Sequence, residues 1–462
     1  MKATFKWRQC GGILVLIGLM TGVMFAQTGG VNTTLIMAVG DSLTAGFQSG
    51  GLSITGQRNG YAVLVAKQMG GFLPLPTITA PGIPPVLTIT STGAIVPSSA
   101  TPGTPLFPPV GNSFHFDVAV PGFRVTDILN QRPLLPDPVN RPNDILRDFI
   151  LGVPGLAVPG AVNVGSEVDQ VQALRPTFII LWIGANDVLG ALTNNNVGLI
   201  TPLASFTSDL QTAVQRLKST GAQMVMANIP DVTATAFVVP VPAVAAQVGA
   251  PVAAVAAALG VTAGDSIFIT GIPTVTAILT GQTAGPLPRR FVLTAADTLT
   301  YQTAIANMNS VIANTASAAG IPLVDIFTAL NGLRANGVFV GGKKLTTFFL
   351  GGVFSLDGIH PTNTGYAIIA NAFLQTINAA YLTSFPMVDV NAVFAADPLA
   401  PLVHKSGRSG GMDEGISLMD LMIDPNAFDG LLQVLTPSTV DTPPAATSDG
   451  SMDPGGSSGL PN

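Results

Sequence analysis

The chain has a single cysteine, Cys10, among its 462 residues. One cysteine can form no disulfide within the chain, so stability must come from the apolar core, and a metal site built from several thiolates is excluded. Charged residues make up only 10% of the sequence, and the net charge of −6 argues against nucleic acid as a partner. Aromatic residues are also scarce, with 2 Trp and 4 Tyr, whereas a polysaccharide cleft usually offers several of them.

Hydrophobic residues are abundant, at 47%, and the chain is long enough for one large α/β domain with additions. Such a chain can bury a large core. Because there is so little charge to cover the surface, the composition also favours an apolar exterior face. A lipid-binding cleft, or a contact with a membrane surface or the cell envelope, would be such a face.

The N-terminus has the pattern of an export signal. The basic residues come first and are Lys2, Lys6 and Arg8. The apolar run from Ile13 to Phe25 follows, and it is short for a membrane span. We predict a signal peptide over residues 1–26 and export to the periplasm, the outer envelope or the extracellular space. The alternative is an uncleaved anchor. Cys10 lies before the apolar run, where it is not placed for lipid attachment.

Five strand-like apolar runs alternate with helix-like stretches. The runs are Thr34–Val39, Phe114–Val120, Thr177–Ile183, Gln223–Ile229 and Ile321–Phe327. The helical patterns lie near residues 60–69, 166–174, 205–219, 295–318 and 362–380. Continuous apolar strands that alternate with helices predict an α/β fold, with a five-stranded parallel sheet covered on both faces.

Three segments fall outside this pattern. Residues 73–112 are rich in Pro, Gly, Ser and Thr, with a small hairpin expected around Ser91-Thr92-Gly93. Residues 231–294 form an insertion of Ala, Val, Pro and Gly with almost no charge. Residues 395–462 turn polar and irregular, and we predict a low-complexity, disordered tail.

Ser42 stands in Gly40-Asp41-Ser42-Leu43, directly after the first apolar run. Open α/β sheets place their chemistry at the carboxyl ends of the strands, so Ser42 is a candidate nucleophile. A serine needs a base, a group that orients the base, and an oxyanion hole. A second Gly-Asp-Ser sequence, at 264–266, follows Val261-Thr262-Ala263 and lacks a buried strand before it.

His360 is the best candidate base among the three histidines. It lies three residues after Asp357, and a turn there can place the carboxylate behind the imidazole. The carboxylate would then accept the Nδ1 proton and leave Nε2 free as the base. The alternative interpretation is a turn with a helix cap, since Asp-Gly and His-Pro form turns readily. His115 begins a strand and favours a structural role, and His404 lies where the globular pattern has faded.

Two residues after other strands can stabilise an oxyanion. Gly122 follows the second run, and without a Cβ its N–H can approach a substrate closely. Asn186 follows the third run, and its side-chain amide can donate to the same oxygen. Each residue alone is more often an ordinary turn residue. The order of all four elements along the chain is what favours a shared site.

These blocks resemble the SGNH hydrolases, also called GDSL lipases and esterases. The blocks are Gly40-Asp41-Ser42-Leu43, Ala119-Val120-Pro121-Gly122, Gly184-Ala185-Asn186-Asp187 and Asp357-Gly358-Ile359-His360. They occur intact and in the family's order. The resemblance implies a flavodoxin-like three-layer α/β/α sandwich, a hydrolase domain over residues 31–394, and hydrolysis of carboxylic esters without a metal ion or other cofactor.

The resemblance also implies roles for these residues. Ser42, Asp357 and His360 match the catalytic residues, and the oxyanion hole would combine the N–H groups of Ser42 and Gly122 with the Asn186 amide. Simple members of the family are shorter than this chain. The roles of residues 73–112 and 231–294 are therefore not carried over.

The substrate is a separate question. Residues 231–294 follow the fourth run, at the edge expected to hold the active site, and we interpret them as a lid or a wall for an acyl chain. An extra helical layer that completes the core is the alternative. We expect a small-molecule or lipid ester as substrate. Two other functions stay open: a carbohydrate esterase that removes acetyl groups, and an envelope-binding protein with an idle hydrolase fold.

Overall fold

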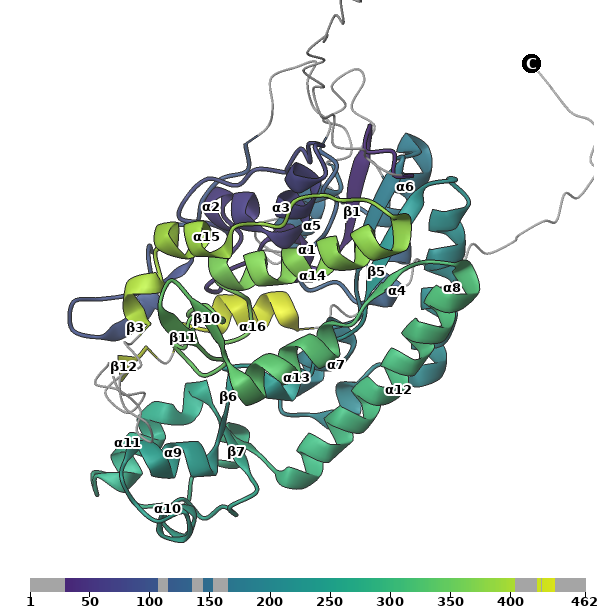
Figure 1. Cartoon of the computed structure of the whole chain (residues 1–462). Coiled ribbons are helices and arrows are strands. Elements are labelled where there is room, and N and C mark those ends of the chain that lie inside the picture. Colours follow the sequence, from purple (N-terminus) through teal and green to yellow (C-terminus); the bar gives the residue numbers. More distant parts are fainter. Residues whose placement is uncertain are drawn as a thin grey trace, which may run out of the picture.

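The computed structural model describes residues 30–106, 115–134, 144–152, 165–403, 422–424 and 426–436 (Figure 1). The predicted signal peptide with Cys10 lies outside these residues, as do His404 and most of the predicted tail. Export and signal cleavage therefore stay predictions.

The central sheet has four parallel strands in the described part of the chain, in the order β1-β4-β5-β9. Their bounds are β1 Ile36–Gly40, β4 Phe178–Trp182, β5 Gln223–Ala227 and β9 Leu323–Val324. All residues of β1 and β4 are buried, as expected for strands covered on both faces. The sheet places Ser42, Asn186 and the residues after β5 along one edge, because all four strands point the same way.

The prediction of a fifth strand is wrong. Residues 116–118 lie beside β1, where Ala38 N–H donates to the Phe116 carbonyl (2.9 Å) and Val118 N–H donates to the Ala38 carbonyl (3.1 Å). Only one parallel bridge, between Ala38 and Asp117, results. The next two N–H groups bind side chains instead of a strand: Ala119 N–H donates to Asp117, and Val120 N–H donates to Glu167. Residues 117–120 are therefore buried, but they do not form a ladder.

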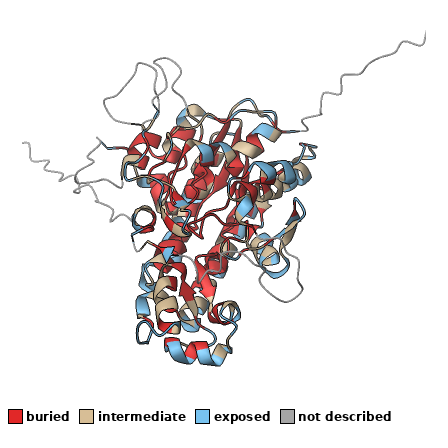
Figure 2. Cartoon of the chain, turned by 90° about the vertical axis from the view of Figure 1, so that its left-hand side faces the viewer, coloured by how far each residue is buried: buried red, intermediate tan, exposed pale blue. Residues whose placement is uncertain are grey.

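Helices cover both faces of the sheet and give the predicted three layers (Figure 1). One face packs against α3 (Tyr61–Gln68) and α14 (Asn363–Tyr381), and the other packs against α4 (Val125–Asn130), α6 (Glu167–Leu174), α8 (Leu203–Lys218) and α12 (Ala295–Ala319). Alternate β1 residues point to opposite faces of the sheet. Ile36 and Ala38 pack on the α3–α14 side, and Met37 and Val39 pack on the other side. Figure 2 shows the buried residues running through the middle of the molecule.

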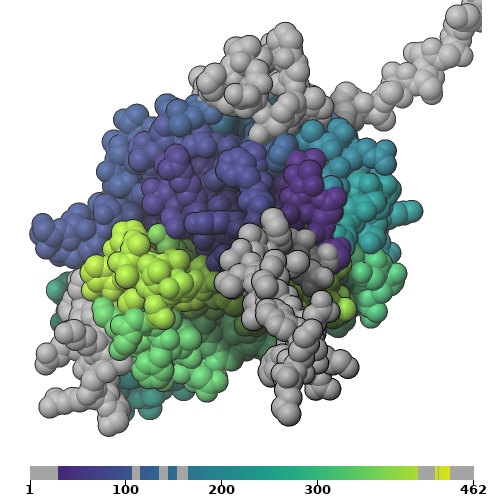
Figure 3. All heavy atoms as spheres, turned by 45° about the horizontal axis from the view of Figure 1, so that its top comes forward, coloured from purple at the N-terminus to yellow at the C-terminus, as the bar shows by residue number. Residues whose placement is uncertain are grey.

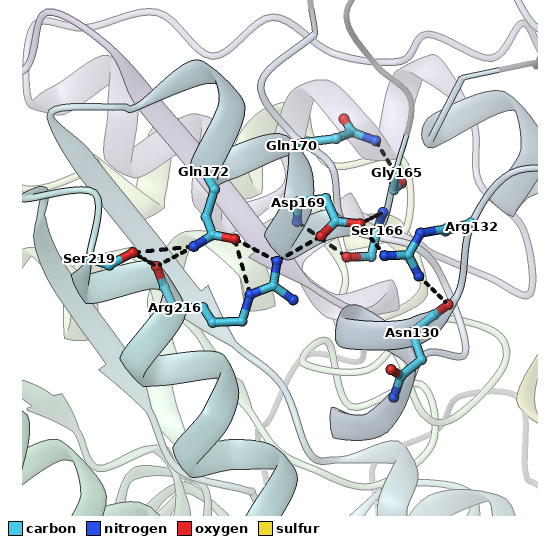
Figure 4. Close-up of polar contacts among 9 residues, drawn as sticks. All are labelled: Asn130, Arg132, Gly165, Ser166, Asp169, Gln170, Gln172, Arg216 and Ser219. Atoms are coloured by element: carbon cyan, nitrogen blue, oxygen red, sulfur yellow. Dashed lines mark hydrogen bonds and ion pairs between the residues drawn. The ribbon is translucent and has the colours of Figure 1, made fainter.

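The side chains of α6 and α8 are joined by a polar network (Figure 4). Asp169 binds Arg216 of α8 at 2.7 Å and Arg132 at 2.6 Å, and it closes a capping box with Ser166. Burial alone would raise the pKa of Asp169, but the two guanidinium groups and the Ser166 N–H outweigh burial and lower it. This network fixes the start of α6, from which Glu167 reaches the active-site turns.

Residues 231–294 form a lobe that projects at the lower end of Figure 1. It contains an antiparallel sheet in the order β6-β7-β8, with three short helices. The elements are β6 Val238–Pro240, α9 Val241–Gln247, α10 Val252–Leu259, β7 Ser266–Phe268, α11 Ile272–Leu279 and β8 Val292–Leu293. Within the described residues no single helix is long and apolar enough to cross a membrane, and only α9 and α10 meet the criteria jointly, as a pair bent by 111°.

The remaining elements lie outside the central sheet and the 231–294 lobe. They are α1 Ser42–Ala45, α2 Ile54–Asn59, α5 Ile145–Ile150, α7 Asn186–Thr193, α13 Ile326–Asn336, β10 Val338–Val340, β11 Lys343–Leu345 and α15 Val390–Ala396. The hairpin predicted around Ser91-Thr92-Gly93 is present as β2 (Leu87–Ile89) and β3 (Ala94–Pro97). In Figure 3 the purple and blue N-terminal residues and the yellow-green residues near 360–400 adjoin on one face.

Part of the predicted disordered tail is ordered. β12 (Met422–Ile423) pairs in parallel with β3, and α16 (Asp429–Leu435) packs against α7. The physical reason is apolar spacing: Phe428, Leu431 and Leu435 bury their side chains at 1% exposure each.

Candidate active site

Ser42 is the first residue of α1, immediately after β1. Asp41 caps this short helix by accepting a hydrogen bond from Leu43 N–H at 3.0 Å. Gly40 allows the turn, because a Cβ there would collide with the Trp182 carbonyl. This strand–turn–helix connection places the Ser42 side chain at the carboxyl edge of the sheet, as the sequence predicts.

Three predicted residues form one hydrogen-bonded chain. Ser42 Oγ lies 2.9 Å from His360 Nε2, and His360 Nδ1 lies 2.8 Å from Asp357 Oδ2. Their exposures are 2%, 1% and 0%, so water cannot compete freely for these contacts. Asp357 and His360 lie in the turn before α14, where the Thr362 side chain caps the helix by accepting from Gly365 N–H. The fold thus brings Ser42 to the Asp357–His360 pair, which lies more than 300 residues further along the sequence.

Asp357 is held by hydrogen bonds from several directions. Its Oδ1 accepts from the N–H groups of Ile359 (2.9 Å) and His360 (2.8 Å), and its Oδ2 accepts from Gly50 N–H (2.7 Å). Burial alone would raise the pKa of Asp357, but the His360 ring and these donors outweigh burial and lower it. An ionised Asp357 holds the Nδ1 proton and leaves Nε2 facing Ser42 as an acceptor.

The other two predicted residues, Asn186 and Gly122, lie at the starts of the segments that follow β4 and the run at 116–120. Asn186 is the first residue of α7, and its Nδ2 donates to the Phe123 carbonyl at 3.0 Å, which fixes the plane of the amide. Gly122 has a φ of +86°, and a Cβ there would collide with the Val434 carbonyl of α16. Ser42, Asn186 and His360 line one cavity, whereas Gly122 lines a second, smaller pocket beside α16.

The cavity at Ser42 has a volume of about 100 Å³, and its walls are almost entirely apolar. Its remaining walls come mainly from one face each of α13 and α14: Ile326, Ala329, Leu330, Leu333, Gly365, Ile368, Ile369 and Ala372. Val232 and Thr235, at the start of the 231–294 lobe, also line it. This lobe therefore contributes to the wall of the cavity.

Four buried carboxyl groups lie among the turns that carry the site residues. The sequence analysis did not predict a role for them in the site. Burial raises the pKa of Asp41 to about 7, of Asp187 to about 7 and of Asp117 to about 8, and it raises that of Glu167 well above its usual value. Glu167 binds the N–H of Gly40 at 2.9 Å and that of Val120 at 3.1 Å. It thereby joins the turns that carry Ser42 and Gly122. No motif marks Glu167 in the sequence, whereas Asp41 and Asp187 adjoin predicted site residues.

The other sequence candidates lie elsewhere. His115 is partly buried, and its ring contacts the Ile150 carbonyl, in keeping with the structural role that the sequence favours. Burial lowers the pKa of His115 to about 4. Among the described residues there is no cluster of three or more His, Cys, Asp or Glu side chains that could hold a metal ion.

Residues 36–373 match the family model of the GDSL-like lipases/acylhydrolases. The chain belongs to this family. Membership supports an ester hydrolase and leaves its substrate unspecified. Among curated proteins, none matches the chain.

Several solved structures are similar to this family member at low sequence identity. They include TesA (13% identity, TM-score 0.31, covering 75% of this chain and 98% of that one) and a GDSL-like lipase from Parabacteroides merdae (10%, 0.33, 75% and 96%). A catalytic mutant of Axe2, an acetylxylan esterase from Geobacillus stearothermophilus, is also similar (13%, 0.35, 76% and 96%).

Proposed function

We propose that this GDSL family member is an exported serine esterase that cleaves carboxylic esters of apolar acyl chains. The observation that carries the proposal is the buried hydrogen-bonded chain from Ser42 through His360 to Asp357. A serine hydroxyl, an imidazole and a carboxylate in this order are the parts that nucleophilic acyl transfer needs.

The reaction would proceed in two steps. His360 Nε2 takes the Ser42 proton while Oγ attacks the ester carbonyl, and His360 then gives that proton to the leaving alcohol oxygen. An acyl-serine remains. Water next gives a proton to His360 and attacks the acyl carbon, and His360 returns the proton to Ser42 Oγ as the carboxylic acid leaves. Asp357 keeps the imidazole in the required tautomer throughout.

The oxyanion would be held by Asn186 and the Ser42 N–H, with Gly122 beside them. Asn186 Nδ2 uses one hydrogen for the Phe123 carbonyl, and its second hydrogen remains for the substrate oxygen. Removing one donor of this kind typically costs about 10²–10³-fold in kcat. Glu167 supports the same arrangement, because it ties the Gly40 and Val120 N–H groups together behind the site.

The apolar cavity supports an acyl chain as the ligand. Gly365 and Ala372 lie on one face of α14, two turns apart, so the cavity runs for about 10 Å along that helix. Walls with so few polar groups favour a hydrocarbon chain over a sugar. An acetyl group would leave most of this space unfilled.

A series of 4-nitrophenyl esters from acetyl to dodecanoyl tests the proposal. We expect kcat/KM to rise from the acetyl ester to a medium-chain ester, and Ser42→Ala to abolish turnover. Ser266→Ala is the matched control, since Ser266 belongs to the second Gly-Asp-Ser sequence and lies in β7. A strict preference for acetyl would contradict the acyl-chain assignment. Undiminished turnover by Ser42→Ala would contradict the nucleophile.

A further inference from the structure

Two long stretches of the chain near the active site expose no acidic side chain. Residues 326–356 contain three basic residues and no Asp or Glu. Residues 232–288, in the lobe, contain a single charged residue, Asp265, and it is buried. In the chain as a whole acidic residues outnumber basic ones, 25 against 19. An anionic partner would therefore meet less repulsion on these two stretches than on the rest of the protein.

The hairpin formed by β10 and β11 presents one face to solvent. Val340 and Leu345 are buried in an apolar cluster. The alternate residues Phe339 and Lys344 pair across the two strands and face outward. Phe339 is 74% exposed. Lys344 is exposed too, and its stem lies over Gly337 at the end of α13, where an added Cβ would be 2.7 Å from Lys344 Cε. The outer face of the hairpin thus combines an aromatic ring with a cation.

Arg334 and Phe348 extend this combination beside a cavity of about 210 Å³, which we call the lobe cavity because residues of the lobe form much of its mostly apolar lining. Both side chains line it. Arg334 is exposed in the last turn of α13, and Phe348 is 54% exposed. In the described part of the chain neither Arg334 nor Lys344 forms an ion pair. We call Arg334, Phe339, Lys344 and Phe348 the basic–aromatic face.

This face adjoins the cavity that holds Ser42. Thr235 lines both that cavity and the lobe cavity. On α13, Leu333 lines the Ser42 cavity, and the next residue, Arg334, lines the lobe cavity. Phe354 belongs to the apolar cluster beneath the hairpin and also lines the Ser42 cavity. The basic–aromatic face therefore lies beside the place where an acyl ester would react.

We propose that the basic–aromatic face docks this protein on an anionic lipid surface, so that acyl esters held in that surface reach the Ser42 cavity. The delivery of esters rests on the proposed function, whereas the docking does not. Exposed apolar side chains that gather in one place mark interaction sites. A lipid surface binds such a face by burying its rings, and anionic headgroups add attraction for the neighbouring cations.

A tryptophan placed on the face tests docking locally. In Phe339→Trp, fluorescence emission should shift to the blue when vesicles of phosphatidylcholine and phosphatidylglycerol in equal parts are added, because the ring enters the lipid. Vesicle co-sedimentation measures affinity. We expect the wild type to bind these vesicles about tenfold or more tightly than vesicles of phosphatidylcholine alone. Phe339→Ala should weaken binding to the mixed vesicles about tenfold, and Lys344→Gln should weaken it about fivefold.

Phe72 and Lys67 provide matched controls on another part of the surface. Phe72 is 79% exposed, but it follows Gly71, where an added Cβ would meet Ile36 at the start of β1. This is the end of the sheet opposite to Ser42. Lys67 is exposed in the last turn of α3. Phe72→Trp should show no emission shift, and Phe72→Ala and Lys67→Gln should bind vesicles as the wild type does. All variants carry the same N-terminus, so differences between them report the substituted position alone.

An unshifted emission of Phe339→Trp, or equal binding of the wild type to the two kinds of vesicle, would overturn the inference. A dimer of the wild type that Phe339→Ala converts to a monomer would also overturn it, because the face would then be an interface between two copies. Failure of the proposed function looks different: 4-nitrophenyl butyrate would not be hydrolysed, while vesicle binding would persist. Otherwise Phe339→Ala should hydrolyse this soluble ester as fast as the wild type.

Discussion

Replacing Asp357 by Asn should stop catalysis by forcing the wrong tautomer of His360. The amide must place its NH₂ group where one carboxylate oxygen stood. At the Oδ1 position the NH₂ would oppose the N–H groups of Ile359 and His360, whereas at Oδ2 it would oppose only Gly50 N–H and could donate to His360 Nδ1. The second arrangement is favoured, because it leaves fewer donors facing one another.

In that arrangement Nδ1 becomes an acceptor and the ring proton moves to Nε2, 2.9 Å from Ser42 Oγ. A protonated Nε2 cannot accept the hydroxyl proton. We expect kcat to fall about 10⁴-fold, as in other triads with this substitution, which corresponds to roughly 5 kcal/mol of transition-state stabilisation. The opposed Gly50 N–H should also lower the free energy of unfolding by about 1–3 kcal/mol.

The assay compares kcat for 4-nitrophenyl butyrate, together with thermal unfolding, in the wild type, Asp357→Asn and Asp357→Ala. The Ala variant imposes no tautomer on His360. The kcat of the Asn variant should therefore be at least as low as that of the Ala variant, although Asn conserves the shape of Asp357. An Asn variant within about tenfold of wild-type kcat would refute the tautomer argument.

Three further predictions follow from the same contacts. Gly122→Ala should lower kcat about a hundredfold and also lower the melting temperature, because φ is +86° and the new Cβ meets the Val434 carbonyl; an unchanged kcat would exclude Gly122 from oxyanion binding. Ala372→Phe should shorten the preferred acyl chain in the 4-nitrophenyl ester series, since it fills the cavity between α13 and α14; an unchanged optimum would place the chain elsewhere. Stability should fall as pH rises from about 4 to 8, because the raised pKa values of Asp41 (about 7) and Asp117 (about 8) make the folded state hold protons that the unfolded state releases. Asp117→Asn should make the melting temperature fall less between pH 5 and pH 9 than it does in the wild type, as measured by melting curves at pH 5, 7 and 9. A fall as large as that of the wild type would contradict this prediction.

The sequence is sufficient for the parts of the site that depend on local pattern. Ser42 follows a continuous apolar run, and the three-residue spacing of Asp357 and His360 fits one turn, so both placements can be predicted from the sequence alone. The three-layer fold follows in the same way from alternating strands and helices. These features need only short-range information.

The rest depends on contacts between distant segments. The apolar run at 114–120 is typical of a strand, but Glu167, on another element, takes the Val120 N–H that a ladder would need. The regular structure in the predicted tail was missed for a different reason. Phe428, Leu431 and Leu435 carry helical spacing, but they lie in a segment whose overall composition is typical of disorder. Only the structure shows that this helix meets Gly122.

The central claim is that Ser42 is the nucleophile. Its most direct test is to label the protein with a fluorophosphonate probe, digest it, and locate the modified residue by mass spectrometry. We predict one modified peptide, carrying the probe on Ser42, and loss of labelling in both Ser42→Ala and heat-unfolded protein. Labelling at any other serine, or labelling of Ser42→Ala at the wild-type level, would contradict the account.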